Sequence, residues 1–240
     1  MAEKIGIILG SGLNSFTNEL SKSKILHEEK NSFHNLKIIT GKISNKEVIL
    51  FSGRKHFYEG YDFEKVLGNV NFAREFGIDL LIITNAAGGL NPVFRVSDLM
   101  LITSHFNFLK NNFSVLNNTS FYNFDILNKI KEYSLKNKIV LRSGSYCCNS
   151  GPMYETKSEI RFLKKIGVDA VGMSTIPEMS AANSYGIKTI AISCITNLLS
   201  ENATGKTDHE EVLVAGKNAG KNFSGLLKNI ISLSQDLIKL

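Results

Sequence analysis

Two segments of the chain place polar and aromatic side chains directly before a predicted helix. The first, Gly151-Pro152-Met153-Tyr154-Glu155-Thr156, offers an aromatic ring and a carboxylate. The second, Val171-Gly172-Met173-Ser174-Thr175-Ile176-Pro177-Glu178, offers a thioether and a hydroxyl. Together these groups are suited to hold a flat heterocycle beside a phosphate. Each also has a simpler explanation, because a carboxylate stabilises a helix N-terminus and Ser174 or Thr175 is a common helix cap.

A third segment, Ser52 to Tyr61, combines basic and aromatic side chains with two glycines. If this segment is extended, Arg54, His56 and Tyr58 point to one side of the backbone. A guanidinium group is suited to bidentate phosphate binding. The alternative is a surface turn with a local Arg–Glu pair. We favour a binding wall, because packing alone does not explain three polar side chains on one face.

Two glycine-containing segments follow predicted strands and carry weaker signals. Gly10-Ser11-Gly12 lacks the third glycine of a dinucleotide-binding motif, since Ser15 stands there, and the chain has no Walker A sequence. It is either a turn that binds a single phosphate or a plain turn. The small residues of the segment 85–89 (Asn-Ala-Ala-Gly-Gly) could let a ligand approach backbone N–H groups. Taken alone, the segment is better explained as a structural turn, and this is what we expect.

Thr196-Asn197 and His209 with Glu210 and Glu211 are polar groups late in the chain. We expect Thr196-Asn197 to form a turn and residues 209–211 to form the solvated first turn of a helix. Neighbouring residues on a helix do not converge on one ion, and the chain has no HExxH motif. We therefore predict no metal site.

Short apolar runs alternate with amphipathic segments along the chain, which predicts an α/β fold with a central mixed β-sheet flanked by helices. We expect one domain over residues 1–240. Predicted strands are Ile5–Leu9, Leu36–Ile43, Val48–Phe51, Leu80–Thr84, Leu99–Thr103, Ile139–Tyr146, Ala170–Gly172 and Thr189–Ile195. Predicted helices include Phe63–Phe76, a helix carrying Ile160, Leu163 and Ile166, and about 209–239, while residues 107–123 read as a long loop.

The polar groups named above come just after these predicted strands. Ligands of α/β sheets bind beyond the carboxyl ends of the strands, so the pattern predicts that the groups meet in one site.

The composition is that of an ordinary globular protein, with 240 residues, 43% hydrophobic and 21% charged. The net charge of +6 raises nucleic-acid binding as a possibility, but there is no run of five basic residues, so we expect a lysine-rich enzyme surface. No apolar run is long enough for a membrane span or a signal peptide, which makes the cytoplasm the expected location. We expect the three cysteines to be reduced thiols.

Taken together, the segments resemble the trimeric purine nucleoside phosphorylase family. The matching segments appear in the family's order and span nearly the whole chain. They are Ile8–Leu13, Gly53–Tyr61, Thr84–Pro92, Gly151–Glu155, Val171–Glu178, Ile195–Asn197 and His209–Val212. The resemblance implies a phosphorylase/hydrolase-like fold, a homotrimer, and no cofactor apart from inorganic phosphate as co-substrate. It implies no nucleic-acid or membrane partner.

The resemblance also implies a role for each site residue in the phosphorolysis of purine nucleosides for purine salvage. Phosphate would bind to Ser11, Arg54, His56, the backbone of Ala86 and Ser174. The ribose would contact Tyr58, Met173 and His209, the last through the 5′-hydroxyl. Tyr154 would stack on the base, and Glu155 and Asn197 would bind its edge. Asn197, Glu155 and His56 would carry the catalysis.

These roles suit 6-oxopurine nucleosides, because an ionised Glu155 accepts from N1–H and Asn197 both donates and accepts. We expect inosine, guanosine and their 2′-deoxy forms as substrates. A xanthosine- or adenosine-tolerant phosphorylase, or a nucleoside-binding homologue without turnover, remains the alternative. The chain departs from the family at Ser32–Asn35 and Asn107–Asn123, and either Phe121 or Phe124 would be the ring lent to a neighbouring subunit.

Overall fold

A mixed β-sheet of nine strands forms the centre of the structure, a computed structural model that describes residues 3–30, 35–109, 122–201 and 209–240. Of residues 209–212 it describes the backbone only. The strands are β1 (Ile5–Leu9), β2 (Ser21–Lys30), β3 (Asn35–Ile43), β4 (Lys46–Ser52), β5 (Leu80–Gly89), β6 (Leu99–Asn107), β7 (Leu141–Cys148), β8 (Ala170–Gly172) and β9 (Lys188–Leu198). Their order is β2-β3-β4-β1-β5-β8-β7-β6-β9.

The sheet also closes on itself, because β5 pairs with β9 as well as with β8. β5 runs parallel to β9 over its whole length, whereas only Gly88 and Gly89 pair with β8, in the antiparallel direction. Five strands, β5, β8, β7, β6 and β9, therefore form a ring, and β1 to β4 extend the sheet from β5. The ring brings the ends of strands that are distant in sequence to one place.

The segment 85–89 is not the turn that we expected from the sequence; it is the second half of β5. Its small side chains explain the difference, because side chains of β9 and of Leu199, the residue after it, lie close to this part of β5. A Cβ on Gly88 would lie 2.8 Å from Leu199 Cδ1, and a Cβ on Gly89 would lie 2.8 Å from Ile195 Cγ2. Glycine is therefore needed here for close packing in a strand and not for a turn.

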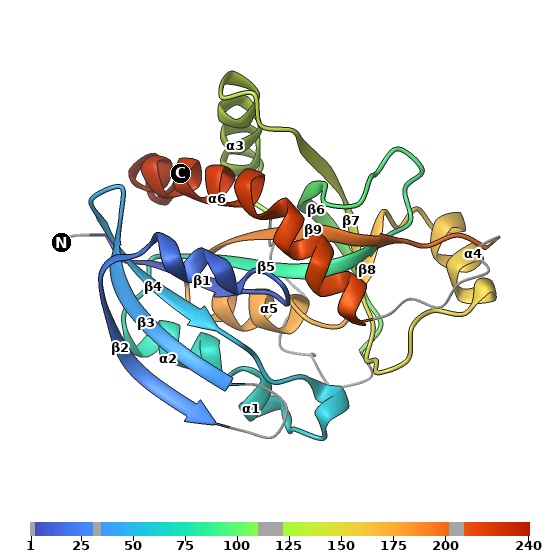
Figure 1. Ribbon diagram of the computed structural model, residues 1–240, viewed down its shortest axis with the longest axis horizontal. Coiled ribbons are helices and arrows are strands. Elements are labelled where there is room, and N and C mark those ends of the chain that lie inside the picture. The colour runs from blue at the N-terminus through green and yellow to red at the C-terminus, as the bar shows by residue number, and fades with distance from the viewer. Residues whose placement is uncertain (1–2, 31–34, 110–121, 202–208) are drawn as a thin grey trace.

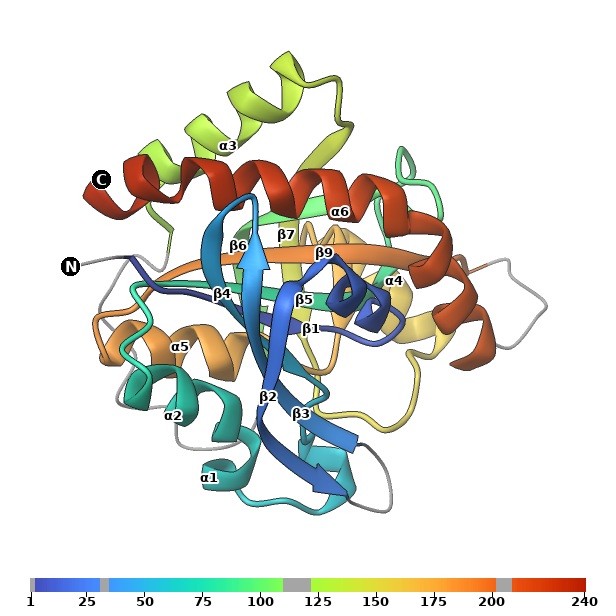
Figure 2. The same cartoon turned by 60° about the vertical axis from the view of Figure 1, so that its left-hand side comes forward.

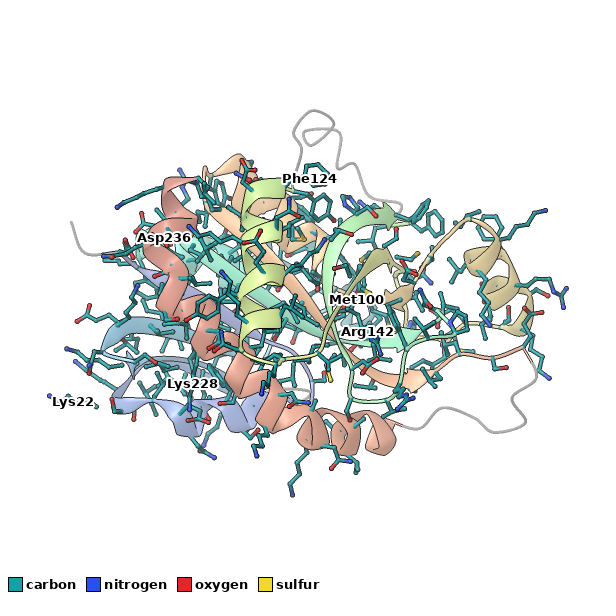
Figure 3. All side chains as sticks on the ribbon, turned by 90° about the horizontal axis from the view of Figure 1, so that it is seen from above. Lys22, Met100, Phe124, Arg142, Lys228 and Asp236 are labelled. Carbon is teal, nitrogen blue, oxygen red and sulfur yellow. The ribbon has the colours of Figure 1, made fainter. Side chains whose placement is uncertain are left out.

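Helices cover both faces of the sheet, as Figures 1 and 2 show. α3 (Phe124–Lys136) and α6 (His209–Lys239) lie on one face, which Figure 3 views from above, and α1 (Phe63–Val66), α2 (Gly68–Glu75) and α5 (Ile176–Ser184) lie on the other. α4 (Lys157–Lys165) packs separately at the end of β7 and β8. Two short 3₁₀ helices, η1 (Asn14–Glu19) and η2 (Phe57–Glu59), follow β1 and β4.

Two hydrophobic clusters lie on opposite faces of the sheet and hold these layers together. One packs α3, α6 and η1 on β1, β5 and β9, with Phe16 of η1 edge-on to Phe223 of α6 at 5.7 Å between ring centroids. The other packs α2 and α5 on β1, β5 and β9 from the opposite face of the sheet. The α/β fold predicted from the alternation of apolar runs and amphipathic segments is thereby confirmed.

Two elements differ from the sequence expectation. The predicted helix Phe63–Phe76 is two helices, α1 and α2, separated at Leu67. β2 was missed, because nine of its ten residues are exposed and it lies at the edge of the sheet, where no apolar side has to be buried. Among the described helices, none is long and apolar enough to cross a membrane.

Candidate active site

A cavity of about 430 Å³ opens where the carboxyl ends of β1, β4, β5, β8 and β9 meet. Every predicted site residue whose side chain is described lines it. These are Ser11, Arg54, His56, Tyr58, Ala86, Tyr154, Glu155, Met173, Ser174 and Asn197. His209 begins α6, but its side chain lies outside the described residues. The prediction that these groups meet beyond the strand ends therefore agrees with the structure.

A buried arginine forms one end of the cavity. Arg54 is 5% exposed, and its guanidinium contacts three elements. Nη1 donates to Ser174 Oγ at 2.7 Å, Nη2 donates to the Thr84 carbonyl at 2.8 Å, and Nε lies 3.5 Å from Glu178 Oε1. The local Arg–Glu surface turn is thus excluded, because the partner carboxylate comes from α5, 124 positions along the chain, and is 2% exposed.

Glu178 is a site residue for which the sequence analysis found no role. Burial raises the pKa of Glu178, and the Arg54 guanidinium and the Thr175 N–H, which donates to Oε2 at 3.0 Å, oppose that rise. Pro177 and Thr175 had predicted only a helix start at this place. Glu178 stands three residues after the N-cap residue Thr175, and this spacing is typical of a carboxylate that caps a helix. The neighbouring sequence, however, does not indicate that Glu178 contacts Arg54.

The corner between β8 and α5 holds Ser174 at this end of the cavity. Its carbonyl accepts from the Tyr146 hydroxyl at 3.2 Å and from the Cys148 thiol at 3.3 Å. The next residue, Thr175, has φ of +82°, unusual for a β-branched residue, and its hydroxyl accepts from Asn85 Nδ2 at 2.8 Å. Thr175 is the N-cap of α5, and the Ser174 hydroxyl instead accepts from Arg54.

His56 sits beside the arginine and is oriented by Glu59, a second carboxylate that the sequence analysis left without a role. Nδ1 lies 2.8 Å from Glu59 Oε1. Because a carboxylate only accepts hydrogen bonds, the contact places a ring proton on Nδ1. Residues 57–59 form η2 and are not extended as expected. Tyr58 still reaches the cavity, with its ring stacked on His56 at 4.8 Å between centroids.

Tyr58 and Met173 form an apolar wall in the middle of the cavity, and Gly151 permits their approach. A Cβ on Gly151 would lie 2.5 Å from Met173 Sδ and 3.0 Å from Tyr58 Cδ1, and the residue has φ of +69°. Burial raises the pKa of Tyr58 to about 12, so its hydroxyl is protonated at neutral pH and can donate.

The other end of the cavity carries a carboxylate and an amide. Burial raises the pKa of Glu155, while a hydrogen bond of 3.0 Å from Asn149 Nδ2 to its Oε1 opposes that rise. Asn197 comes from β9, where Ala87 pairs with Ile195 but Gly88 pairs with Asn197. The extra residue, Thr196, is a β-bulge, and bulges re-aim the next side chain. Asn197 is therefore not in the turn that we expected.

Tyr154 lies beside Glu155 on the loop between β7 and α4 and lines the same end of the cavity. Ser11 approaches from β1, whose end is joined to β5 by the hydrogen bond from Gly10 N–H to Thr84 Oγ1 at 3.0 Å. Of the two candidates for a lent ring, only Phe124 is described, and it does not line the cavity in one chain. Phe121 lies outside the described residues, and Phe124 is 67% exposed at the start of α3 (Figure 3).

Within the parts of the chain that the structure describes, no group of three or more His, Cys, Asp or Glu side chains is arranged to hold a metal ion.

Comparison with known proteins agrees with this arrangement. The model of the phosphorylase superfamily matches residues 4–232. Purine nucleoside phosphorylase 1 of Bacillus subtilis is 37% identical over 95% of this chain and 92% of its own length, and the purine nucleoside phosphorylase of Bos taurus is 34% identical over 96% and 90%. A crystal structure of the Schistosoma mansoni purine nucleoside phosphorylase in complex with adenosine superposes with a TM-score of 0.87 at 29% identity, covering 96% of this chain and 91% of that one.

The buried pair predicts a large stability loss when its carboxylate is removed. Glu178→Ala leaves Arg54 buried without its anionic partner, so we expect the free energy of unfolding in urea to fall by about 3–5 kcal/mol. The matched control is Glu201→Ala, which breaks the exposed 3.0 Å pair with Arg161 and should cost about 1 kcal/mol or less. Equal losses in the two variants would contradict the role given to Glu178.

Proposed function

Because the chain belongs to the phosphorylase superfamily and, within it, to the purine nucleoside phosphorylases, we propose that it cleaves the N-glycosidic bond of purine nucleosides with inorganic phosphate. The products are the free purine base and ribose 1-phosphate or its 2-deoxy form. The members of this family are pentosyltransferases. We assign inosine, guanosine and their 2′-deoxy forms as the substrates, in purine salvage, with phosphate as co-substrate and no further cofactor.

One observation carries this proposal: a single cavity has anion-binding groups at one end and base-binding groups at the other. Arg54, Ser174 and His56 supply the donors for a phosphate, and Glu155 and Asn197 supply an acceptor and an amide for a purine edge. Tyr58 and Met173 lie between the two ends, where the ribose of a bound nucleoside would lie between its base and the inorganic phosphate. One continuous cavity thereby offers places for a base, a ribose and a phosphate.

The arrangement of charges suits the transition state of phosphorolysis. As the glycosidic bond breaks, positive charge develops on the ribose and negative charge on the leaving purine. A phosphate held by Arg54 and Ser174 faces the ribose cation, so the protein has only to fix its position. The Asn197 amide can donate to N7 as that atom gains charge. His56, with one proton held on Nδ1 by Glu59, faces the phosphate with Nε2, which donates to it when the ring carries a second proton.

The carboxylate of Glu155 determines the base preference. When ionised it accepts from N1–H of hypoxanthine or guanine, and from the 2-amino group of guanine. Adenine has no proton on N1, so its lone pair would face the carboxylate, and a polar site rejects such a mismatch strongly. Adenosine tolerance still deserves a direct measurement, because the Schistosoma mansoni relative has been crystallised with adenosine as well as with inosine. Xanthosine use, or binding without turnover, is the remaining alternative.

The first experiment measures base release from inosine, xanthosine and adenosine, each with and without inorganic phosphate. We expect hypoxanthine release from inosine that depends on phosphate, and much slower release from adenosine. Release that is independent of phosphate would identify a hydrolase. Tight inosine binding without release would identify a binding protein, and faster cleavage of xanthosine or adenosine would overturn the base assignment.

A second prediction concerns the pH dependence that Glu155 imposes. Burial raises its pKa, so the ionised form needed for N1–H is lost at a higher pH than for an exposed glutamate. We expect kcat/KM for inosine to fall as the pH is lowered through this raised pKa. Glu155→Gln should remove that acid limb and lower kcat/KM about 10³-fold, with KM for phosphate unchanged, since phosphate binds at the far end. An acid limb that persists in Glu155→Gln would contradict the assignment.

We also propose that the protein is a cytoplasmic homotrimer in which one subunit lends a phenylalanine to its neighbour. The three free, buried cysteines are compatible with a reducing compartment. Light scattering should give three times the 26.6 kDa of one chain, and the mass of a single chain would contradict the assembly.

Within a trimer, Phe124→Ala should raise KM for inosine if Phe124 is the lent ring, whereas an unchanged KM points to Phe121.

A further inference from the structure

Asn149 stands directly behind Glu155 and does not line the cavity. It follows the last residue of β7, and its backbone N–H donates to the Gly172 carbonyl at 2.8 Å. That bond ties the residue to the end of β8, the strand that leads into the Ser174 corner. The position of the Asn149 side chain is therefore set by the sheet and not by the loop that carries Glu155.

The side-chain amide of Asn149 is oriented by a contact on each side. Its Oδ1 accepts from the Cys147 thiol at 3.6 Å, and its Nδ2 donates to Glu155 Oε1 at 3.0 Å. Burial raises the pKa of Cys147 to about 12, so the thiol keeps its proton and can only be the donor in this contact. Because the thiol occupies the amide oxygen, the amide nitrogen faces the carboxylate.

We propose that Asn149 is a positioning residue for base recognition, which holds the Glu155 carboxylate in one orientation and stabilises its ionised form. This inference rests on the proposed function of Glu155 as the acceptor for the purine N1–H. A carboxylate on a loop can rotate and present either oxygen, or take up a proton. With Oε1 held by an amide donor that is fixed to the sheet, the base meets a carboxylate that is already oriented and charged.

The effect has a definite sign. A hydrogen bond from a neutral donor favours the carboxylate over the carboxylic acid. Burial acts in the opposite direction and is the largest influence on the pKa of Glu155; the Glu159 carboxylate adds to that rise, while the backbone of Glu155 itself, like Asn149, opposes it. Removing the Asn149 amide therefore raises the pKa of Glu155 further. A hydrogen bond to a charged group typically changes such an equilibrium by about tenfold, which corresponds to about one pH unit.

The test compares Asn149→Ala, Asn149→Asp and a matched control, Asn183→Ala. Asn149→Ala deletes the donor, and Asn149→Asp keeps the shape but puts a second carboxylate beside Glu155. Asn183 makes a comparable amide bond to the Met179 carbonyl at 3.2 Å, on α5 and outside the cavity lining, so its removal controls for the loss of one asparagine hydrogen bond.

We expect the acid limb of kcat/KM for inosine to move to higher pH by about one unit in Asn149→Ala and by more in Asn149→Asp, because two adjacent carboxylates resist double ionisation. At pH values below the limb this lowers kcat/KM about tenfold, while at alkaline pH most activity returns. KM for phosphate should not change, and Asn183→Ala should behave as the unmodified protein. A parallel loss at every pH, with the limb unmoved, would overturn the proposal by showing a merely structural role.

A measurement without turnover separates this inference from the proposed function. The pKa of the Glu155 carboxyl can be read by carbon-13 NMR of the glutamate carboxyl signals, assigned with Glu155→Gln. A higher pKa in Asn149→Ala supports the positioning role even if inosine is not cleaved. An unchanged pKa overturns it even if the protein proves to be an active phosphorylase.

Discussion

The buried guanidinium of Arg54 is the constraint on which the site depends. A cation taken out of water must be paired and hydrogen-bonded, and Arg54 finds its partners on three separate elements. The Thr84 carbonyl comes from β5, Ser174 from the corner after β8, and Glu178 from α5. These elements must be assembled correctly before the charge can be buried. The same contacts leave the Ser174 hydroxyl and the guanidinium together at one end of the cavity, so folding and the proposed anion binding use one set of groups.

The closed ring of strands determines how the opposite end is built. Gly88 and Gly89 allow side chains at the end of β9 to lie close to β5, and the bulge at Thr196 directs Asn197 toward the cavity. Glu155 reaches the same place on the loop after β7, with Asn149 behind it. The amide thus comes from β9 and the carboxylate from the loop after β7, two strands that do not pair with each other but belong to the same closed ring. Asn85, in the middle of β5, links this ring to Thr175 at the anion-binding end.

Much of the fold and most of the site residues could be predicted from the sequence. The apolar runs located eight of the nine strands, and the matching family segments identified ten residues that line one cavity. The failures have physical causes. β2 is an exposed edge strand without a buried face, so it carries no alternation. Residues 85–89 look like a turn because their side chains are small, but the reason for their size is the close packing of neighbouring strands.

The sequence by itself determined the kinds of groups available, their order along the chain and the strand ends at which they appear, because those depend on local periodicity and residue type. Only the tertiary structure decided which groups face each other. Glu59 acts on His56, Glu178 on Arg54 and Asn149 on Glu155, and local pattern assigned none of these pairings. A hydrogen bond or an ion pair requires a separation of about 3 Å, and for the last two pairs that separation depends on the packing of the sheet, its corners and its helices.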